Sequence, residues 1–131
     1  MKNLFAGSLA VAAAAGLSLS VQAASVTDED FHYDTTADLY QVCSTPNDAA
    51  ESLIASFSCR AFIEATVQYH DAVSDKKTLK RLICYPNGAT IADGRQAFLA
   101  WAKANQDDKT LMGEQPVVGL VRALAAKYPC R

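Results

Sequence analysis

The chain has four cysteines, all beyond its apolar N-terminal segment: Cys43, Cys59, Cys84 and Cys130. Whether they form disulfides limits the folds that the chain can adopt. An even number of cysteines in a small exported protein is typical of a disulfide framework. The spacing contains no Cys-x-x-Cys redox motif, and neither histidine falls at the spacing of a zinc-ligand set. For an exported chain, the cysteines therefore predict two structural disulfides and no metal site.

The N-terminal segment has the three parts of a secretory signal peptide in the right order. Lys2 supplies a positive charge, residues 4–19 are rich in Ala and Leu and carry no charge, and Val21 and Ala23 frame a cleavage site. A membrane anchor is the alternative, but a spanning helix needs about 20 apolar residues and this run is shorter. We therefore expect cleavage after Ala23, export to the periplasm, and no membrane anchor in the mature protein.

The mature part, residues 24–131, has the length of a single domain. The net charge of the whole chain is −2, and the loss of Lys2 with the signal peptide makes the remainder more acidic. This balance disfavours a nucleic-acid partner, which requires a basic surface. Residues 24–34 are polar and acidic, and predict a flexible N-terminal arm in front of a folded domain at residues 35–131.

Capping residues and apolar spacing predict an all-α domain of four to five helices held together by disulfides. Each helix start has a physical signal: a threonine N-cap, or a proline at the first helical position, where its missing N–H costs no hydrogen bond. The expected helices run from Thr35 or Thr36 to about Cys43, from Pro46 to about Val73, from Thr90 to about Ala104, and from Pro116 to about Tyr128.

The central helix carries apolar residues at the spacing of one helix face, and we expect this face to pack on the core. The polar segment between the last two helices, residues 105–115, predicts an exposed loop. The residues expected to be buried are Leu53, Ile54, Phe57, Ala61 and Ala65, flanked by Phe62, Ile63 and Val67, in the central helix, Ile91, Phe98, Trp101 and Ala102 in the third, and Val117, Leu120, Val121, Leu124 and Tyr128 in the last.

Four cysteines allow three pairings, and their spacing alone selects none of them. Helix geometry favours one pairing. If the third and fourth helices form an antiparallel hairpin, Cys84 before the first lies beside Cys130 after the second. Cys43 is then left to pair with Cys59, which requires the short first helix to fold back along the central one.

The strongest catalytic signal is the run Tyr69-His70-Asp71 near the end of the central helix. Secreted phospholipases carry a His-Asp pair on a helix, but they also need adjacent cysteines before the histidine and a Gly-rich calcium loop, which this sequence lacks. Neighbouring helical residues point about 100° apart, so His70 and Asp71 are not expected to orient each other. With every cysteine in a disulfide, no thiol nucleophile remains. We predict a binding module without a cofactor, not an enzyme.

Several segments resemble a known family by their order and spacing. They are Thr36-Ala37-Asp38-Leu39-Tyr40-Gln41-Val42-Cys43, Cys59-Arg60-Ala61-Phe62-Ile63-Glu64-Ala65, Ile83-Cys84-Tyr85-Pro86-Asn87-Gly88-Ala89-Thr90, and the closing Ala123-Leu124 and Tyr128-Pro129-Cys130. Together they resemble the Rap/Tai family of periplasmic immunity proteins, which protect against peptidoglycan amidase effectors of type VI secretion. The family tends to have Gly where Ala65 stands, and a shorter interval between its first two cysteines.

The resemblance implies a helical protein, often a homodimer, that inhibits its cognate amidase by occlusion. A protruding element would enter the catalytic cleft of the effector, which requires a rigid scaffold and an exposed segment of complementary charge. Two segments qualify as partner-binding candidates. One is the acidic tip formed by Gln106, Asp107 and Asp108, together with Glu114, and the other is the charged loop with Asp75, Lys76 and Lys77.

A general periplasmic binding protein, or an acid-stress chaperone of the small disulfide-bonded helical type, is the alternative. Such a chaperone needs an element that responds to pH. The acidic arm offers one, because neutralising its carboxylates and charging its histidine would change its interactions. These residues are Asp28, Glu29, Asp30, His32 and Asp34.

Overall fold

The computed structural model describes residues 25–74 and 79–130; the predicted signal peptide and its cleavage site lie outside them. The described residues form one short 3-10 helix and five α-helices, which confirms the predicted all-α class. The helices are η1 (Asp28–His32), α1 (Thr36–Ser44), α2 (Ser52–Ser74), α3 (Ile91–Ala104), α4 (Lys109–Met112) and α5 (Pro116–Lys127). None of the helices in the described part is long and apolar enough to cross a bilayer.

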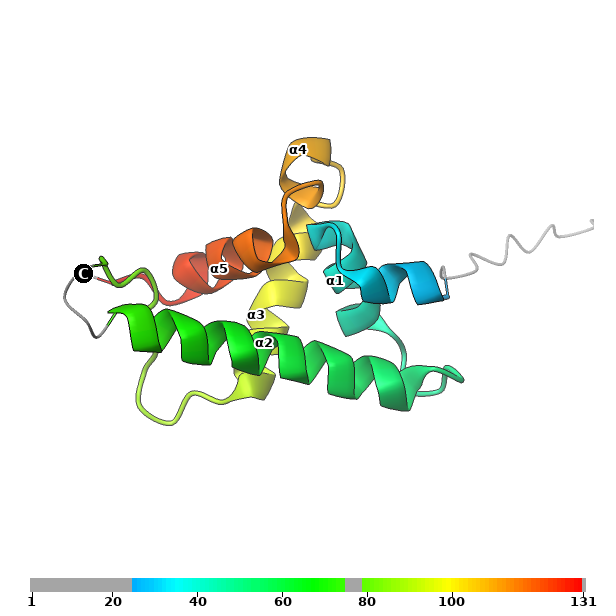
Figure 1. Cartoon of the computed structure of the whole chain (residues 1–131), viewed down its shortest axis with the longest axis horizontal. Coiled ribbons are helices and arrows are strands. Elements are labelled where there is room, and N and C mark those ends of the chain that lie inside the picture. Colours follow the sequence, from blue (N-terminus) through cyan, green and yellow to red (C-terminus); the bar gives the residue numbers. More distant parts are fainter. Residues whose placement is uncertain (1–24, 75–78, 131) are drawn as a thin grey trace, which may run out of the picture.

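Helices α1, α3 and α5 pack against one another, and α2 runs along one side of this group (Figure 1). The short helix α4 projects on the side opposite α2, between the end of α3 and the start of α5. The core lies where α1, α2, α3 and α5 meet. Its fully buried side chains are Leu39, Val42, Ile63, Phe98, Leu120 and Leu124.

Three helices begin at the residues that the sequence predicts: α5 begins at Pro116, and the other two have threonine N-caps. Thr35 caps α1 and Thr90 caps α3, and in each case the threonine hydroxyl accepts a hydrogen bond from the backbone N–H three residues on. The carboxylate of that third residue, Asp38 or Asp93, accepts a bond from the threonine N–H, at 2.7 Å and 2.8 Å. Hydrogen bonds from Thr90 lower the pKa of Asp93. These reciprocal bonds satisfy the free N–H groups of each first turn.

The central helix begins later than predicted. Thr45 is not the N-cap of α2: it closes the end of α1, with its hydroxyl donating to the Gln41 carbonyl at 3.1 Å. The residues after Pro46 form turns, and α2 starts only at Ser52. A helix beginning at Pro46 would leave too little chain to reverse direction after α1. The turns supply that reversal and allow α2 to run back along α1.

Both disulfides have the connectivity that helix geometry favours. Cys43–Cys59 joins α1 to α2, with a Cα–Cα distance of 5.1 Å, and both residues are fully buried. Cys84–Cys130 joins the segment before α3 to the end of the chain after α5. A hydrogen bond from the Cys84 N–H to the Tyr128 carbonyl, 2.9 Å long, holds the same two segments together.

The segment predicted as a flexible arm is packed against the domain. It contains η1, and Val26 just before η1 is only 7% exposed. Tyr33 adopts a left-handed conformation, with φ of 55°, and turns the chain from η1 into α1. The Tyr33 ring lies on Phe62 of α2, with 5.1 Å between ring centroids. Apolar contacts of Val26 and Tyr33 therefore fix η1 on the domain, although the segment is acidic in composition.

The rotation of α2 differs from the prediction. Its buried residues are Ala55, Cys59, Ile63 and His70, whereas Leu53, Ile54 and Phe57 are 69%, 58% and 65% exposed. The disulfide explains this, because Cys59 must face Cys43 on α1. Residues four positions before and after Cys59 share its side of the helix. The centre of the predicted core face of α2 therefore faces solvent, whereas its predicted flank is correct: Ile63 is fully buried, and Phe62 and Val67 pack against the core.

Helices α1 and α5 touch closely at Thr36 and Gly119. The N–H and hydroxyl of Thr36 both donate to the Glu114 carbonyl, at 2.7 Å and 3.0 Å. The Thr36 side chain is fully buried and fills the space in which a Cβ on Gly119 would stand. Only a residue without a side chain fits at this contact.

Candidate partner-binding site

The predicted acidic tip lies at the projecting end of the molecule, where α4 stands between α3 and α5 (Figure 1). Gln106, Asp107 and Asp108 are exposed. Asp108 has a structural role as the N-cap of α4, because its Oδ1 accepts from the N–H groups of Thr110 and Leu111 at 2.9 Å and 3.1 Å. Gln106 and Asp107 are thus the residues of the tip that are best placed to meet a partner.

Glu114 belongs to the scaffold rather than to the exposed tip. Its carboxylate accepts two hydrogen bonds from the Arg122 guanidinium, both 2.7 Å long, and its side chain is 24% exposed. This pairing raises the pKa of Arg122. The Glu114 carbonyl also receives the bonds from Thr36. The two ends of the tip segment are therefore fastened, one by Glu114 and the other by Asn105, whose side chain donates to the Trp101 carbonyl at 2.7 Å.

Only part of the predicted charged loop lies within the described residues. Asp75, Lys76 and Lys77 lie outside the described residues. Arg81, at the end of the charged stretch, lies 3.4 Å from the carboxylate of Asp71 on α2. The structure thus gives the base of this loop and leaves its role as a prediction.

An apolar surface on α2 that was predicted to be buried is exposed in the structure. Leu53, Ile54 and Phe57 form its large part, and the exposed small residues Ala61 and Ala65 continue it along the helix. We call these five residues the α2 face. Large exposed apolar patches on soluble proteins mark interaction sites. The signal for it was present in the sequence, because Cys59 indicates which side of the helix must point inward.

A second apolar surface lies on α5. Val117 and Val118 are 39% and 37% exposed, and together with Val121, Ala125 and Leu82 they line a groove of about 370 Å³. We call it the α5 groove. Val117 and Val121 were predicted to be core residues. Val117 is 39% exposed, whereas Val121 is partly buried and packs against the core, to which α5 also contributes the buried Leu120, Ala123 and Leu124.

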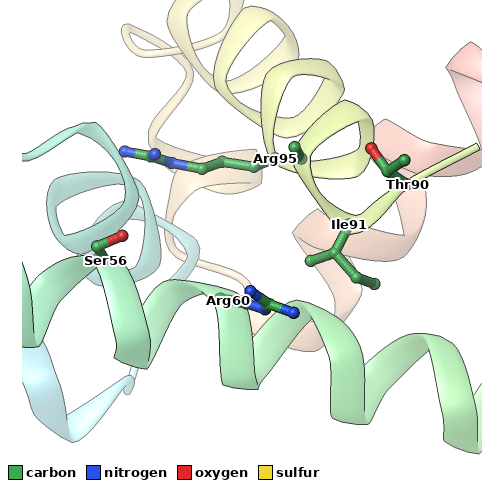
Figure 2. A pocket seen from close by; sticks show the side chains of 6 residues that line it. Ser56, Arg60, Thr90, Ile91 and Arg95 are labelled. Carbon is green, nitrogen blue, oxygen red and sulfur yellow. The ribbon is translucent and has the colours of Figure 1, made fainter.

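A third hollow, of about 330 Å³, lies between α2 and the start of α3 (Figure 2). Ser56 and Arg60 line it from α2, and Ile91 stands opposite them (Figure 2). Arg95 also lines the hollow and reaches toward α1, where its Nε and a terminal nitrogen donate to the Cys43 carbonyl at 3.0 Å and 2.6 Å. Arg95 thus satisfies a backbone carbonyl at the end of α1, so its guanidinium has a structural role.

His70 and Asp71 do contact each other, contrary to the expectation from helix geometry. The Nδ1 atom of His70 lies 3.0 Å from an Asp71 carboxylate oxygen. The direction of the Cα–Cβ bonds differs by about 100°, but Nδ1 lies near the backbone and the Asp71 side chain bends toward it. His70 is buried, with 7% of its surface exposed. Asp71 is 38% exposed, and His70 also contacts the backbone of Leu82, which lines the α5 groove.

Three exposed side chains near the N-terminal end of the domain, which the sequence did not predict to be neighbours, lie close together. Ligand atoms of Glu29, His32 and Asp34 lie within 4.8 Å of one another, and all three residues are exposed. The turn at Tyr33 brings Asp34 back beside η1. Exposed groups of this kind are common without an ion, and Nδ1 of His32 lies 3.6 Å from a Glu29 carboxylate oxygen.

A model of a protein family matches residues 35–130, from the N-cap of α1 to the last cysteine, and its description is Rap1a immunity proteins. The chain belongs to this family. No curated protein and no solved structure gives a significant match. Membership confirms the resemblance to the Rap/Tai immunity proteins.

A Rap1a immunity protein is expected to bind a cognate effector protein, and this expectation suits the surfaces found here. The acidic tip, the α2 face and the α5 groove are exposed surfaces of the described domain. The family match excludes η1, which begins before Thr35. Features shared with the Rap1a family are therefore to be sought in α1 to α5.

Proposed function

We propose that this chain is a periplasmic immunity protein that binds and occludes a peptidoglycan amidase toxin delivered by type VI secretion. The observation that carries the proposal is the match to the Rap1a immunity family over nearly the whole folded domain. The two disulfides support an oxidising compartment, since such bonds persist in the periplasm and are rare in the cytosol. In this role the chain protects the producing cell and its kin.

The acidic tip is the proposed occluding element. It projects from the scaffold, and both of its ends are fastened, so little conformational entropy is lost when it enters a cleft. Asp107 offers an exposed carboxylate to an amidase cleft built around a catalytic cysteine and histidine. The charged loop with Asp75, Lys76 and Lys77 is the second candidate.

Co-expression with a candidate amidase toxin, sought in the genes that neighbour the one for this chain, tests the function. We expect full-length chain to restore growth of cells that export the toxin, and a version lacking residues 2–23 to give no protection. The purified proteins should bind with roughly nanomolar affinity. Absence of both protection and binding would overturn the proposal. Suppression of the aggregation of unrelated proteins at falling pH would instead identify a chaperone.

Replacing Asp107 with lysine is expected to weaken binding of the amidase at least tenfold, about 1.4 kcal/mol, because it reverses a charge at the proposed contact. The measurement is isothermal titration calorimetry with purified effector. Glu51→Lys is the matched control: it makes the same charge change at an exposed residue in the turns before α2. Unchanged binding by Asp107→Lys, with loss of binding by Lys76→Glu and Lys77→Glu, would assign occlusion to the charged loop.

We further propose that two copies associate as a homodimer through the α2 face. Its large residues, Leu53, Ile54 and Phe57, occupy the N-terminal half, and its small residues follow, so an antiparallel pair would place large against small. Such a symmetric contact is self-complementary. Arg60 and Glu64 flank the face and lie 3.8 Å apart within the helix.

Phe57→Glu is expected to weaken self-association on the order of 100-fold, because an unpaired charge in an apolar interface costs several kcal/mol. Light scattering coupled to size-exclusion chromatography measures the mass over a range of concentrations. Val118→Glu is the control, since it changes an exposed valine on α5 in the same way. A wild-type chain that remains monomeric, or a Phe57→Glu variant that remains dimeric, would contradict the proposed interface.

A further inference from the structure

His70 is a buried titratable side chain that the proposed function does not use. It lies on the last turns of α2, and its side chain is 8% exposed. Both ring nitrogens have partners. Nδ1 lies 3.0 Å from an Asp71 carboxylate oxygen, and Nε2 lies 3.2 Å from the backbone nitrogen of Leu82, twelve residues further along the chain.

These two contacts define the protonation state of the ring. A backbone N–H can only donate, so Nε2 must be the unprotonated nitrogen that accepts from Leu82. The single proton of the neutral ring is then on Nδ1, where it is donated to Asp71. A second proton could be added only at Nε2, where it would face the Leu82 N–H and abolish the hydrogen bond.

We propose that His70 is a pH-dependent switch: its neutral ring holds Leu82 at the end of α2, and its protonation releases Leu82 from the α5 groove. Histidine is the side chain whose charge ordinarily changes between about pH 5 and pH 8. Protonation adds a proton from solvent at Nε2 and breaks one hydrogen bond. The proposal does not depend on the identity of any partner.

The charged groups around His70 define what the imidazolium would meet. On α2, an Asp71 carboxylate oxygen lies 3.0 Å from Nδ1 of the ring, and Arg81 lies 3.4 Å from the same carboxylate. Tyr85 stays neutral throughout, because burial together with the negative charge of Asp71 raises its pKa to about 12. On α5, the guanidinium of Arg122 is held by Glu114. After protonation, the Arg81–Asp71 ion pair would still hold the base of the loop, while the Leu82 bond would be lost.

The position of Leu82 gives this switch a surface effect. Its side chain is 50% exposed and forms one wall of the α5 groove, opposite Val117, Val118 and Val121. The next residue, Ile83, is fully buried and is bridged to Pro129. The chain therefore has a fixed point at Ile83 and a proton-sensitive one at Leu82. Acidification should change the groove and leave the disulfide-linked segment beyond it in place.

Nuclear magnetic resonance of the ¹⁵N-labelled chain tests the proposal directly. At about pH 8 the nitrogen shifts of His70 should show the tautomer protonated at Nδ1. On acidification, the Leu82 amide proton should lose its hydrogen-bonded shift with the same midpoint as the His70 ring. Three results would each overturn the proposal: the opposite tautomer, a Leu82 amide that ignores the titration, or a ring that stays neutral while the chain remains folded.

Two variants separate the switch from general acid effects. His70→Gln keeps an oxygen that can accept from Leu82 but does not titrate, so its Leu82 amide should stay hydrogen-bonded at every pH. His70→Phe has no acceptor, so its Leu82 amide should be released at every pH. His32→Gln removes the other, exposed histidine and should leave the Leu82 titration unchanged. If His70→Phe does not fold, the titrations of the Leu82 amide in the wild-type chain and in His70→Gln still test the proposal. A Leu82 amide that titrates equally in His70→Gln would contradict the proposal.

Discussion

Replacing Cys43 and Cys59 with alanine should lower the free energy of unfolding by about 4 to 5 kcal/mol. Closing a loop of sequence separation 16 accounts for about 3 kcal/mol in the chain-entropy model. The remainder comes from the space left in the core, because both sulfurs are fully buried. A domain of this size has only about 5 to 15 kcal/mol of stability, so the variant should be close to unfolding.

The second disulfide provides the matched comparison. Cys84–Cys130 closes the longer loop, with sequence separation 46, and its removal should cost about 4 kcal/mol. Cys84 is exposed, so serine and alanine should be equivalent there. At Cys43 and Cys59, serine should be worse than alanine by about 1 to 3 kcal/mol for each hydroxyl left without a partner.

Urea denaturation of the four double variants, monitored by circular dichroism, measures these free energies. An unchanged midpoint after removal of either pair would show that the helices alone hold the domain. Equal stability of the alanine and serine variants at Cys43 and Cys59 would contradict the burial of that disulfide. Treatment of the wild-type chain with a reductant should reproduce the combined loss.

Gly119→Ala should destabilise the domain by about 2 to 4 kcal/mol, because its Cβ would overlap the buried side chain of Thr36. Overpacking a core contact costs about 1 to 3 kcal/mol. Moving Thr36 also strains the hydrogen bonds that it donates to the Glu114 and Gln115 carbonyls, at 3.0 Å and 3.3 Å. Thermal denaturation should show the change as a clearly lower midpoint.

Gly94→Ala is the control for Gly119→Ala, since Gly94 is also buried within a helix. A Cβ there would meet Ile63 and Leu124 at 3.6 Å and 3.7 Å, which is ordinary contact. We expect this variant to be neutral or to gain up to about 1 kcal/mol from helix propensity. Equal losses for the two glycines would mean that the α1–α5 contact at Thr36 is not the cause.

The elements with local signals were predictable from the sequence. The two Thr-Asp caps, at Thr35 and Thr90, and the proline at the start of α5 each act within a few residues, and each marks a helix start correctly. The start of α2 was missed because Thr45 has the chemistry of both an N-cap and a chain end. Which role it takes depends on the reversal between α1 and α2, which is a tertiary requirement.

The orientation of α2 could not be read from its apolar spacing, because the helix has apolar residues on more than one side. Leu53, Ile54 and Phe57 form as convincing a face as Ala55, Cys59 and Ile63. Only the disulfide partner of Cys59 distinguishes them. The tip shows the same limit: Glu114 is as acidic as Asp107, and the structure alone reveals that Arg122 and Thr36 engage it.

The fastening of the tip at Asn105 and Glu114 has a consequence for how such chains diverge. Between these anchors, only Met112 is buried, and both disulfides lie elsewhere. Substitutions at Gln106 and Asp107 therefore meet little thermodynamic constraint. If the tip occludes the toxin as proposed, recognition of a different toxin can evolve there one exposed residue at a time. The core and both disulfides would remain unchanged.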